Sequence, residues 1–253
     1  MSFIKPIWSA PDRVQTLVTT RQGGISSPPY DSLNLGDHVG DQSSRVLANR
    51  QILKKHLPSE PIWLNQIHGT VVSTPFSRAQ KMSRPFEADA VVTNIPGEVL
   101  AIMTADCLPV LFSTSEGLVV GAAHAGWRGL CDGVLENTVA KMLELAHESA
   151  AKDVIAWMGP AIGPESFEVG EDVVGRFQEV GLHDISKSFL PIANKPGKYL
   201  ADIYQLARDR LGAVGVNAVF GGGVCTVKDQ ERFFSYRRDG ITGRFASLIW
   251  ISR

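Results

Sequence analysis

Residues 99–125, VLAIMTADCLPVLFSTSEGLVVGAAHA, contain three apolar runs separated by short polar breaks. The runs at residues 100–104, 110–113 and 118–123 consist mainly of Val, Ile, Leu and Ala, and each has the length of one strand. The spacing between the runs leaves room only for tight connections. This stretch therefore predicts consecutive buried strands, and a sheet, in the middle of the chain.

Short apolar runs continue on both sides of this stretch. Further strands are expected at residues 14–20, 62–66, 71–74, 88–94, 155–158, 218–221, 233–236 and 245–251. Apolar residues at helical spacing predict helices over residues 43–57, 129–150 and 199–214. Runs of strands followed by helices favour an α+β fold, with mixed β-sheets flanked by helices. Because no repeat or linker divides the chain, we expect a single domain over residues 1–253.

The composition is that of an ordinary globular protein. Hydrophobic residues make up 44% and charged residues 20% of the chain, which excludes disordered, collagen-like and coiled-coil classes. The 25 Lys and Arg balance 26 Asp and Glu without long runs of one sign, which argues against a nucleic-acid binder. No apolar run reaches the ~20 residues of a membrane helix, and residues 1–13 lack the pattern of a secretory signal. We therefore expect a cytoplasmic protein that binds neither nucleic acid nor membrane.

Three motifs place reactive side chains beside the expected strands. Asp106 and Cys107 follow the strand at residues 100–104, where apolar residues would otherwise continue. His124 stands among Ala and Gly, whose small size lets a ligand or another backbone approach closely. His68 follows two amide side chains at a strand end. Each of these residues is also consistent with plain core packing, and their separations match no short zinc-finger rule.

The cysteines suit a reducing compartment. The chain has three, Cys107, Cys131 and Cys225, and no CxxC pair. This odd number does not suit a disulfide framework. Cys131 and Cys225 are expected to be buried thiols, with Cys225 the better candidate for a site because its loop precedes the arginine pair at residues 237–238.

Seven motifs then occur in order along nearly the full chain. They are TRQGG (20–24), SLNL (32–35), NQIHG (65–69), TADCLP (104–109), HAGWRG (124–129), GPAIGP (159–164) and SYRRD (235–239). The set resembles the family known as purine nucleoside phosphorylases, laccase-domain proteins or multicopper polyphenol oxidases, and peptidoglycan editing factors. The resemblance implies mixed sheets flanked by helices, similar also to a cysteine-hydrolase toxin domain.

The resemblance further implies one zinc ion held by His68, Cys107 and His124. Three protein ligands leave a fourth position for water or substrate, as in catalytic zinc sites. Cys107, His124 and Asp106 are the expected catalytic residues. The amides of Asn65 and Gln66 are expected to orient the ligands or contact substrate.

The implied activity is phosphorolysis of adenosine, inosine, guanosine or methylthioadenosine, with deamination of adenosine as a second activity. The expected partners are therefore a purine nucleoside and phosphate, bound by a monomer or a small homo-oligomer. Phosphate needs cations, for which arginine is well suited. The candidates are Arg21, Arg128, Arg237 and Arg238. Deamination by a zinc-activated water needs a carboxylate to move protons, and Asp106 and Glu168 are the candidates.

A multicopper centre is not expected, because the chain has six histidines and no His-x-His pair. Copper at the same three ligands stays open, since copper(II) outcompetes zinc in most nitrogen and sulfur sites. Two alternatives also stay open. One is a hydrolase that edits peptidoglycan precursors, with zinc or with Cys107 as nucleophile and His124 as base. The other is a binding module in which zinc is structural.

Overall fold

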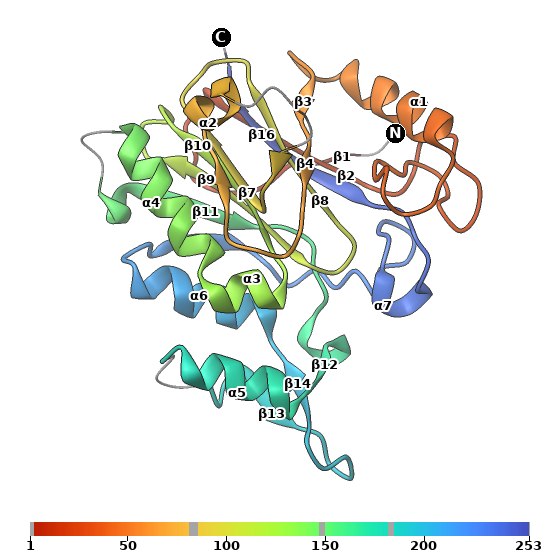
Figure 1. The fold of residues 1–253 in the computed structure, drawn as a ribbon, viewed down its shortest axis with the longest axis vertical. Coiled ribbons are helices and arrows are strands. Elements are labelled where there is room, and N and C mark those ends of the chain that lie inside the picture. The colour runs from red at the N-terminus through yellow and green to blue at the C-terminus, as the bar shows by residue number, and fades with distance from the viewer. Residues whose placement is uncertain (1–2, 81–85, 147–149, 182–184, 253) are drawn as a thin grey trace.

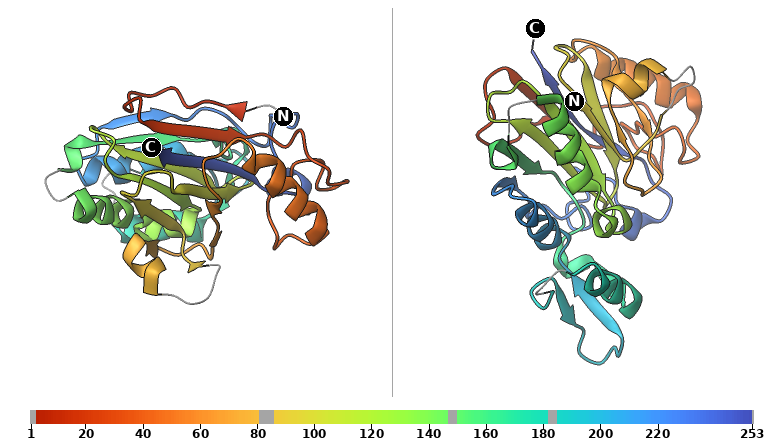
Figure 2. Two further views of the ribbon diagram at one scale, coloured as in Figure 1. Left: turned by 90° about the horizontal axis from the view of Figure 1, so that it is seen from above. Right: turned by 60° about the vertical axis from the view of Figure 1, so that its left-hand side comes forward.

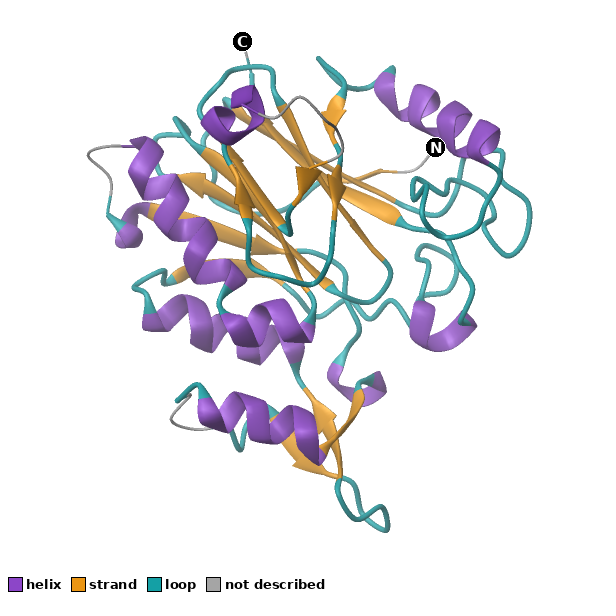
Figure 3. Ribbon diagram, viewed as in Figure 1, coloured by secondary structure: helices purple, strands orange, loops and turns teal. Residues whose placement is uncertain are grey.

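The structure, a computed structural model, describes residues 3–80, 86–146, 150–181 and 185–252. Two β-sheets pack face to face, and helices lie outside them (Figures 1 and 3). The mixture of sheets and helices confirms the predicted α+β class. Within the described ranges, no helix is both long and apolar enough to cross a membrane.

The first sheet has five strands, and the fourth strand in its order, β8 (Val99–Thr104), is buried on both faces. Their order is β1 (Phe3–Ile4), β2 (Val14–Thr19), β16 (Phe245–Ile251), β8 and β3 (Pro61–Ile62). Successive side chains of a strand alternate between two faces. Leu100 and Ile102 of β8 accordingly lie in the core between the sheets. Ala101 and Met103 pack on the other side, against Leu53 of α1 (Ser43–Lys54).

The second sheet has six strands and carries the middle of the chain. Their order is β15 (Ala218–Gly221), β11 (Val154–Met158), β9 (Leu108–Thr114), β10 (Val120–Ala125), β7 (Ala90–Thr93) and β5 (Val72–Ser73). Strand β9 pairs antiparallel with both β10 and β11, whereas β15 is parallel to β11. Val120 and Ala122 face the first sheet, and Ala123 and Ala125 face the helices.

Helices cover the outer face of the second sheet (Figure 2). They are α3 (Trp127–Asp132), α4 (Val134–Ala146) and α6 (Ile203–Ala213). The single helix predicted over residues 129–150 is wrong, because Gly133 adopts a left-handed φ of 100° and ends α3. Residues 147–149 of that prediction lie outside the described ranges.

A small lobe projects from the two sheets (Figures 1 and 2). It consists of β12 (Glu168–Gly170), α5 (Glu171–Glu179), β13 (Phe189–Pro191) and β14 (Lys198–Ala201), flanked by the short 3-10 helix η2 (Pro164–Ser166). The helix predicted from residue 199 starts later than expected. Residues 199–201 pair in β14, and Asp202 caps α6 by accepting the N–H groups of Tyr204 and Gln205.

Short elements complete the chain. They are β4 (Leu64–Asn65), which pairs with β6 (Phe86–Glu87), together with α2 (Pro75–Gln80), η1 (Ala151–Asp153) and α7 (Tyr236–Asp239). The predicted strand at residues 233–236 is wrong. Phe233 and Phe234 are buried, but Ser235 accepts the N–H of Arg238 and starts a helical turn instead.

Candidate metal centre

Three predicted residues meet at one end of the packed sheets. His68 lies in the loop after β4, Cys107 in the turn between β8 and β9, and His124 in β10. Their candidate ligand atoms all lie within 4.8 Å of one another. Cys107 Sγ is 3.7 Å from His68 Nε2, and the two imidazole centroids are 4.7 Å apart. Among the described residues, this is the group of His, Cys, Asp and Glu side chains arranged to hold a metal ion.

The strand order explains why Cys107 and His124 meet. Strand β8 belongs to the first sheet and β9 to the second, so the turn at residues 105–107 crosses between the sheets. In the antiparallel pair of β9 and β10, Leu108 lies opposite Ala125 and Pro109 opposite His124. The thiol at the start of β9 is thereby placed beside the histidine near the end of β10.

Glycines after His124 allow the loop of His68 to approach. A Cβ atom on Gly126 would lie 2.7 Å from His68 Cδ2 and 3.3 Å from Cys107 Sγ. A Cβ atom on Gly129 would lie 2.7 Å from the carbonyl oxygen of Gly69. The small side chains predicted to make room around His124 therefore admit a second backbone and both other members of the group.

Asp89, which the sequence analysis did not single out, joins the two histidines. Its fully buried carboxylate accepts the backbone N–H groups of Ile67, His68 and Gly69 at 3.2, 2.9 and 2.7 Å. It also accepts a hydrogen bond from His124 Nδ1 at 2.8 Å. His124 Nε2 is therefore left for Cys107. The same carboxylate holds His68 at a positive φ of 61°, which non-glycine residues rarely adopt.

Charge polarises the site before any ion binds. Burial by itself would raise the pKa of Cys107, but the charge and hydrogen bonds of His124, and then of His68, lower it to about 6. Burial would lower the pKa of His124, but Cys107 and Asp89 raise it to about 9. At neutral pH the metal-free site therefore holds a thiolate and an imidazolium, and the thiolate is the form that binds metals.

The donor set fits zinc. Zinc binds sulfur and imidazole nitrogen at about 2.0–2.3 Å, so neighbouring ligands of a tetrahedral ion lie roughly 3.5 Å apart. The 3.7 Å from Cys107 Sγ to His68 Nε2 is close to that separation. The hydrogen bond from His124 to Asp89 is also typical of metal-binding histidines, whose second nitrogen is held by a carboxylate.

Two pockets adjoin Cys107 and share Ala105 and Tyr236 in their linings. A pocket of about 290 Å³ contains all three candidate ligands and is further lined by His38, Gln66, Met103, Thr104, Ala105, Tyr236 and Arg244. A pocket of about 190 Å³ is lined by Ala105, Asp106, Trp127, Ile162, Phe167, Ile203, Tyr236 and Arg237 together with Cys107. We call them the polar pocket and the apolar pocket.

The predicted substrate residues separate into those near the pockets and those elsewhere. Gln66 lines the polar pocket, where its amide exchanges two hydrogen bonds with the backbone of Met103. Arg237 lines the apolar pocket and lies 5.6 Å over the ring of Phe167. Asn65 and Arg128 are exposed and line neither pocket.

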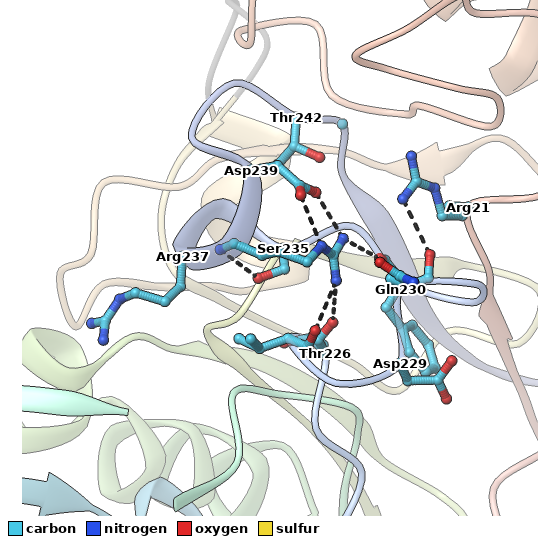
Figure 4. Close-up of polar contacts among 12 residues, drawn as sticks. Arg21, Thr226, Asp229, Gln230, Ser235, Arg237, Asp239 and Thr242 are labelled. Carbon is cyan, nitrogen blue, oxygen red and sulfur yellow. Dashed lines mark hydrogen bonds and ion pairs between the residues drawn. The ribbon is translucent and has the colours of Figure 1, made fainter. Parts of the chain in front are cut away.

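Arg21 and Arg238 lie at a different pocket, of about 600 Å³. Arg21 donates to Asp31 and to the carbonyl of Gln230, as Figure 4 shows for the latter. Arg238 donates to the Asp239 carboxylate and to backbone carbonyls, including that of Thr226. These donors hold the chain around α7 together. The side chain of Arg237 points away from this network (Figure 4).

The two carboxylates predicted to move protons, those of Asp106 and Glu168, already have partners in the structure. Asp106 has a positive φ of 102°, and its two carboxylate oxygens accept hydrogen bonds from Thr226 Oγ1 and from the N–H of Arg237, both at 2.6 Å. It thereby ties the turn at residues 105–107 to α7. Glu168 forms an ion pair with Lys195 at 2.8 Å and lines neither pocket.

The other two cysteines lie outside both pockets. Cys131 is buried in α3. Cys225 is half-buried, and its Sγ accepts the N–H of Gly163 at 3.2 Å.

Replacing Asp89 with Asn should weaken metal binding. The amide keeps the size of the carboxylate but loses its charge and turns two donors toward N–H groups. We expect affinity for zinc to fall about 10–100-fold and unfolding free energy to fall by about 1–3 kcal/mol. A competition titration against a chromophoric chelator measures the first, and thermal unfolding the second. Asp12→Asn, at an exposed site, is the matched control. A folded D89N protein with wild-type zinc affinity would contradict the role of Asp89.

Cys107 should react as a thiolate in metal-stripped protein. Because its pKa is lowered to about 6, the rate of alkylation by iodoacetamide should rise through pH 6 and level off above pH 7. Added zinc should suppress the reaction. Mass spectrometry of peptides resolves the three cysteines, and Cys131 serves as internal comparison because burial raises its pKa. A rate at Cys107 that climbs steadily to pH 9 would show an ordinary thiol.

Known proteins resemble this chain over nearly its full length. The model of the multi-copper polyphenol oxidoreductase laccase family matches residues 15–252. A protein of Haemophilus influenzae named purine nucleoside phosphorylase is 50% identical over 99% of both chains. Purine nucleoside phosphorylase YfiH of Escherichia coli is 50% identical over 98% of both.

Solved structures share the whole fold. Neisseria meningitidis protein NMB0706 superposes with a TM-score of 0.91 at 47% identity, over 100% of both chains. YlmD from Geobacillus stearothermophilus superposes with a TM-score of 0.85 at 32% identity, over 96% of this chain and 93% of that one. The chain therefore belongs to the multi-copper polyphenol oxidoreductase laccase family, in which relatives sharing about half of its residues are named purine nucleoside phosphorylases.

Proposed function

We propose that the protein is a zinc-dependent purine nucleoside phosphorylase whose active site contains His68, Cys107 and His124. The observation that carries the proposal is the position of Cys107 between a polar pocket and an apolar pocket. Phosphorolysis requires an enzyme to bind a strongly charged anion and a nucleoside whose base is flat and largely apolar. Two pockets of different character suit these two substrates. The names of the relatives support the same reaction. Adenosine, inosine, guanosine and methylthioadenosine are the proposed substrates.

In this reaction a phosphate oxygen forms a bond with C1′ of the ribose while the bond from C1′ to the purine nitrogen breaks. The electron pair of that bond goes to the purine, which takes up the proton that phosphate gives up. His68, Cys107 and His124 would hold the zinc, which would supply a Lewis acid when bound. The polar pocket receives the anion and the apolar pocket receives the base.

The residues of the apolar pocket suit a purine. Trp127 and Phe167 present aromatic surface, and Ile162 and Ile203 complete an apolar lining that excludes water. Arg237 uses Nη1 for the carbonyls of Ser166 and Glu168. Its Nε and Nη2 have no hydrogen-bond partner among the described residues, so we assign them to the polar edge of the base.

Asp89 and Asp106 act on this site through other residues. Asp89 fixes the imidazole of His124 and the backbone of His68, and Asp106 fixes the turn that carries Cys107. Deamination of adenosine has weaker support, because it needs a carboxylate that can exchange protons. Both oxygens of Asp106 are already hydrogen-bonded, and Glu168 lies outside the two pockets.

A second candidate function is hydrolysis of an amide, such as that of a peptidoglycan precursor, by the metal-free site. One observation favours it. Cys107, His124 and Asp89 form a chain of thiolate, imidazolium and carboxylate, the order that cysteine hydrolases use. Bound zinc would block this chemistry, so metal dependence separates the two functions.

Product analysis tests the proposal. Zinc-loaded protein incubated with adenosine or inosine should release the free base and ribose-1-phosphate only when phosphate is present, as measured by mass spectrometry. His124→Ala should lose bound zinc and at least about 100-fold of turnover, because it removes a ligand and its charge. His56→Ala, at an exposed position after α1, is the matched control. Phosphate-independent products would count against the phosphorylase, and phosphorolysis that survives complete zinc removal would count against its dependence on zinc.

A further inference from the structure

The polar pocket contains an arginine outside all the motifs, Arg244, directly before β16. Its backbone is fixed on both sides, because its N–H donates to Asn34 Oδ1 at 2.9 Å and its carbonyl accepts the N–H of Leu35 at 3.0 Å. A Cβ atom on Gly36 would lie 2.8 Å from Arg244 Cγ. The loop at residues 34–36 therefore packs closely on the arginine and holds it in place.

The guanidinium of Arg244 is only partly satisfied. Its Nη1 donates to the carbonyls of Thr242 and Gly243 at 3.1 and 3.0 Å. Within the described ranges, its Nε and Nη2 have no hydrogen-bond partner, and no carboxylate forms an ion pair with it. A half-buried guanidinium without a carboxylate is an unfavourable arrangement unless an anion completes it. The Nε and Nη2 edge is the one that binds a carboxylate or phosphate through two parallel hydrogen bonds.

Thr104 is a buried neighbour of Arg244 at the same pocket. Its side chain is 1% exposed, and its Oγ1 has no hydrogen-bond partner among the described residues. Thr104 lies opposite Phe245 in the antiparallel pair of β8 and β16, one residue from Arg244. The hydroxyl is therefore enclosed by protein, and Arg244 is the member of this pair whose unpaired donors are available to an anion in the pocket that holds the three candidate ligands.

The charge balance of the polar pocket favours an anion. With zinc and the Cys107 thiolate in place, Arg244 leaves the pocket with net positive charge. The nearby carboxylates are taken, since Asp106 is bonded to Thr226 and Arg237, and Asp37 pairs with Arg50 at 3.3 Å. Burial lowers the pKa of Arg244, and the negative charges of Cys107 and Asp106 raise it.

We propose that Arg244 binds the phosphate of the phosphorolysis reaction, in the polar pocket beside Cys107. The proposal rests on the proposed function for the identity of the anion, and on the unpaired groups for the site itself. Arg244 donates from Nε and Nη2 to two phosphate oxygens. The phosphate is then on one side of Cys107 and the base on the other, so that C1′ of the ribose lies between them.

Equilibrium binding of inorganic phosphate to the zinc-loaded protein tests the site directly by isothermal titration calorimetry. Arg244→Gln should weaken binding at least about 10-fold, because it removes a charge-assisted, two-point contact. Arg244→Lys should recover only part of the loss, since it restores the charge without the paired geometry. Arg13→Gln, an exposed position with the same change in charge, should bind as the wild type does. Thermal unfolding verifies that each variant is folded.

Steady-state kinetics separates the site from the reaction. If phosphorolysis occurs, Arg244→Gln should raise the KM for phosphate about 10-fold or more and leave the KM for the nucleoside nearly unchanged. If R244Q binds phosphate as tightly as the wild type, or if R13Q loses as much affinity as R244Q, the proposed site is wrong. Neither result argues against phosphorolysis. Phosphate binding that depends on Arg244 without any phosphorolysis supports the site and counts against the proposed function. A wild-type protein that does not bind phosphate overturns the site.

Discussion

The buried carboxylate of Asp89 is the constraint on which the geometry of the site depends. An unpaired charge in the protein interior is strongly unfavourable, and Asp89 avoids this by accepting three backbone N–H groups and the Nδ1 proton of His124. These bonds join the loop after β4, the start of β7 and the end of β10. His68 consequently takes a left-handed backbone conformation, and the imidazole of His124 is oriented before any ligand arrives.

The same arrangement explains why one set of residues suits two chemistries. The carboxylate favours an imidazolium at His124, and the imidazolium favours a thiolate at Cys107. A cation that replaces the imidazolium proton would meet a thiolate and two oriented nitrogens, which is the donor set of a zinc site with an open position. Asp106 accepts a hydrogen bond from Thr226 and so holds the turn that carries Cys107. Cys107 lines both pockets.

Much of the fold follows from local sequence, because hydrophobic period and strand length are local properties. The strands around residues 100–104 and 245–251 are of this kind. The three side chains of the candidate centre were instead expected together because their motifs resemble those of a known family. The apolar pattern over residues 129–150 predicted one helix, but the left-handed backbone of Gly133 divides it. The pattern over residues 233–236 predicted a strand, but the side chain of Ser235 caps a helical turn there. Asp89 offered one signal, an acid inside an expected strand, but its partners are separated from it in sequence. The same is true of Arg244, whose surroundings come from residues 34–36 and β8. Arg21 and Arg238 lie in family motifs and were expected to bind phosphate. In the structure their guanidinium groups donate to backbone carbonyls, such as those of Gln230 and Thr226.

X-ray absorption spectroscopy of the purified, metal-analysed protein tests the central claim most directly. The account predicts one zinc ion per chain, with one sulfur at about 2.3 Å, two imidazole nitrogens at about 2.0–2.1 Å and one exchangeable oxygen. The sulfur contribution should disappear in Cys107→Ser. A first coordination shell without sulfur, or one filled by four protein ligands, would contradict an open metal centre built from His68, Cys107 and His124.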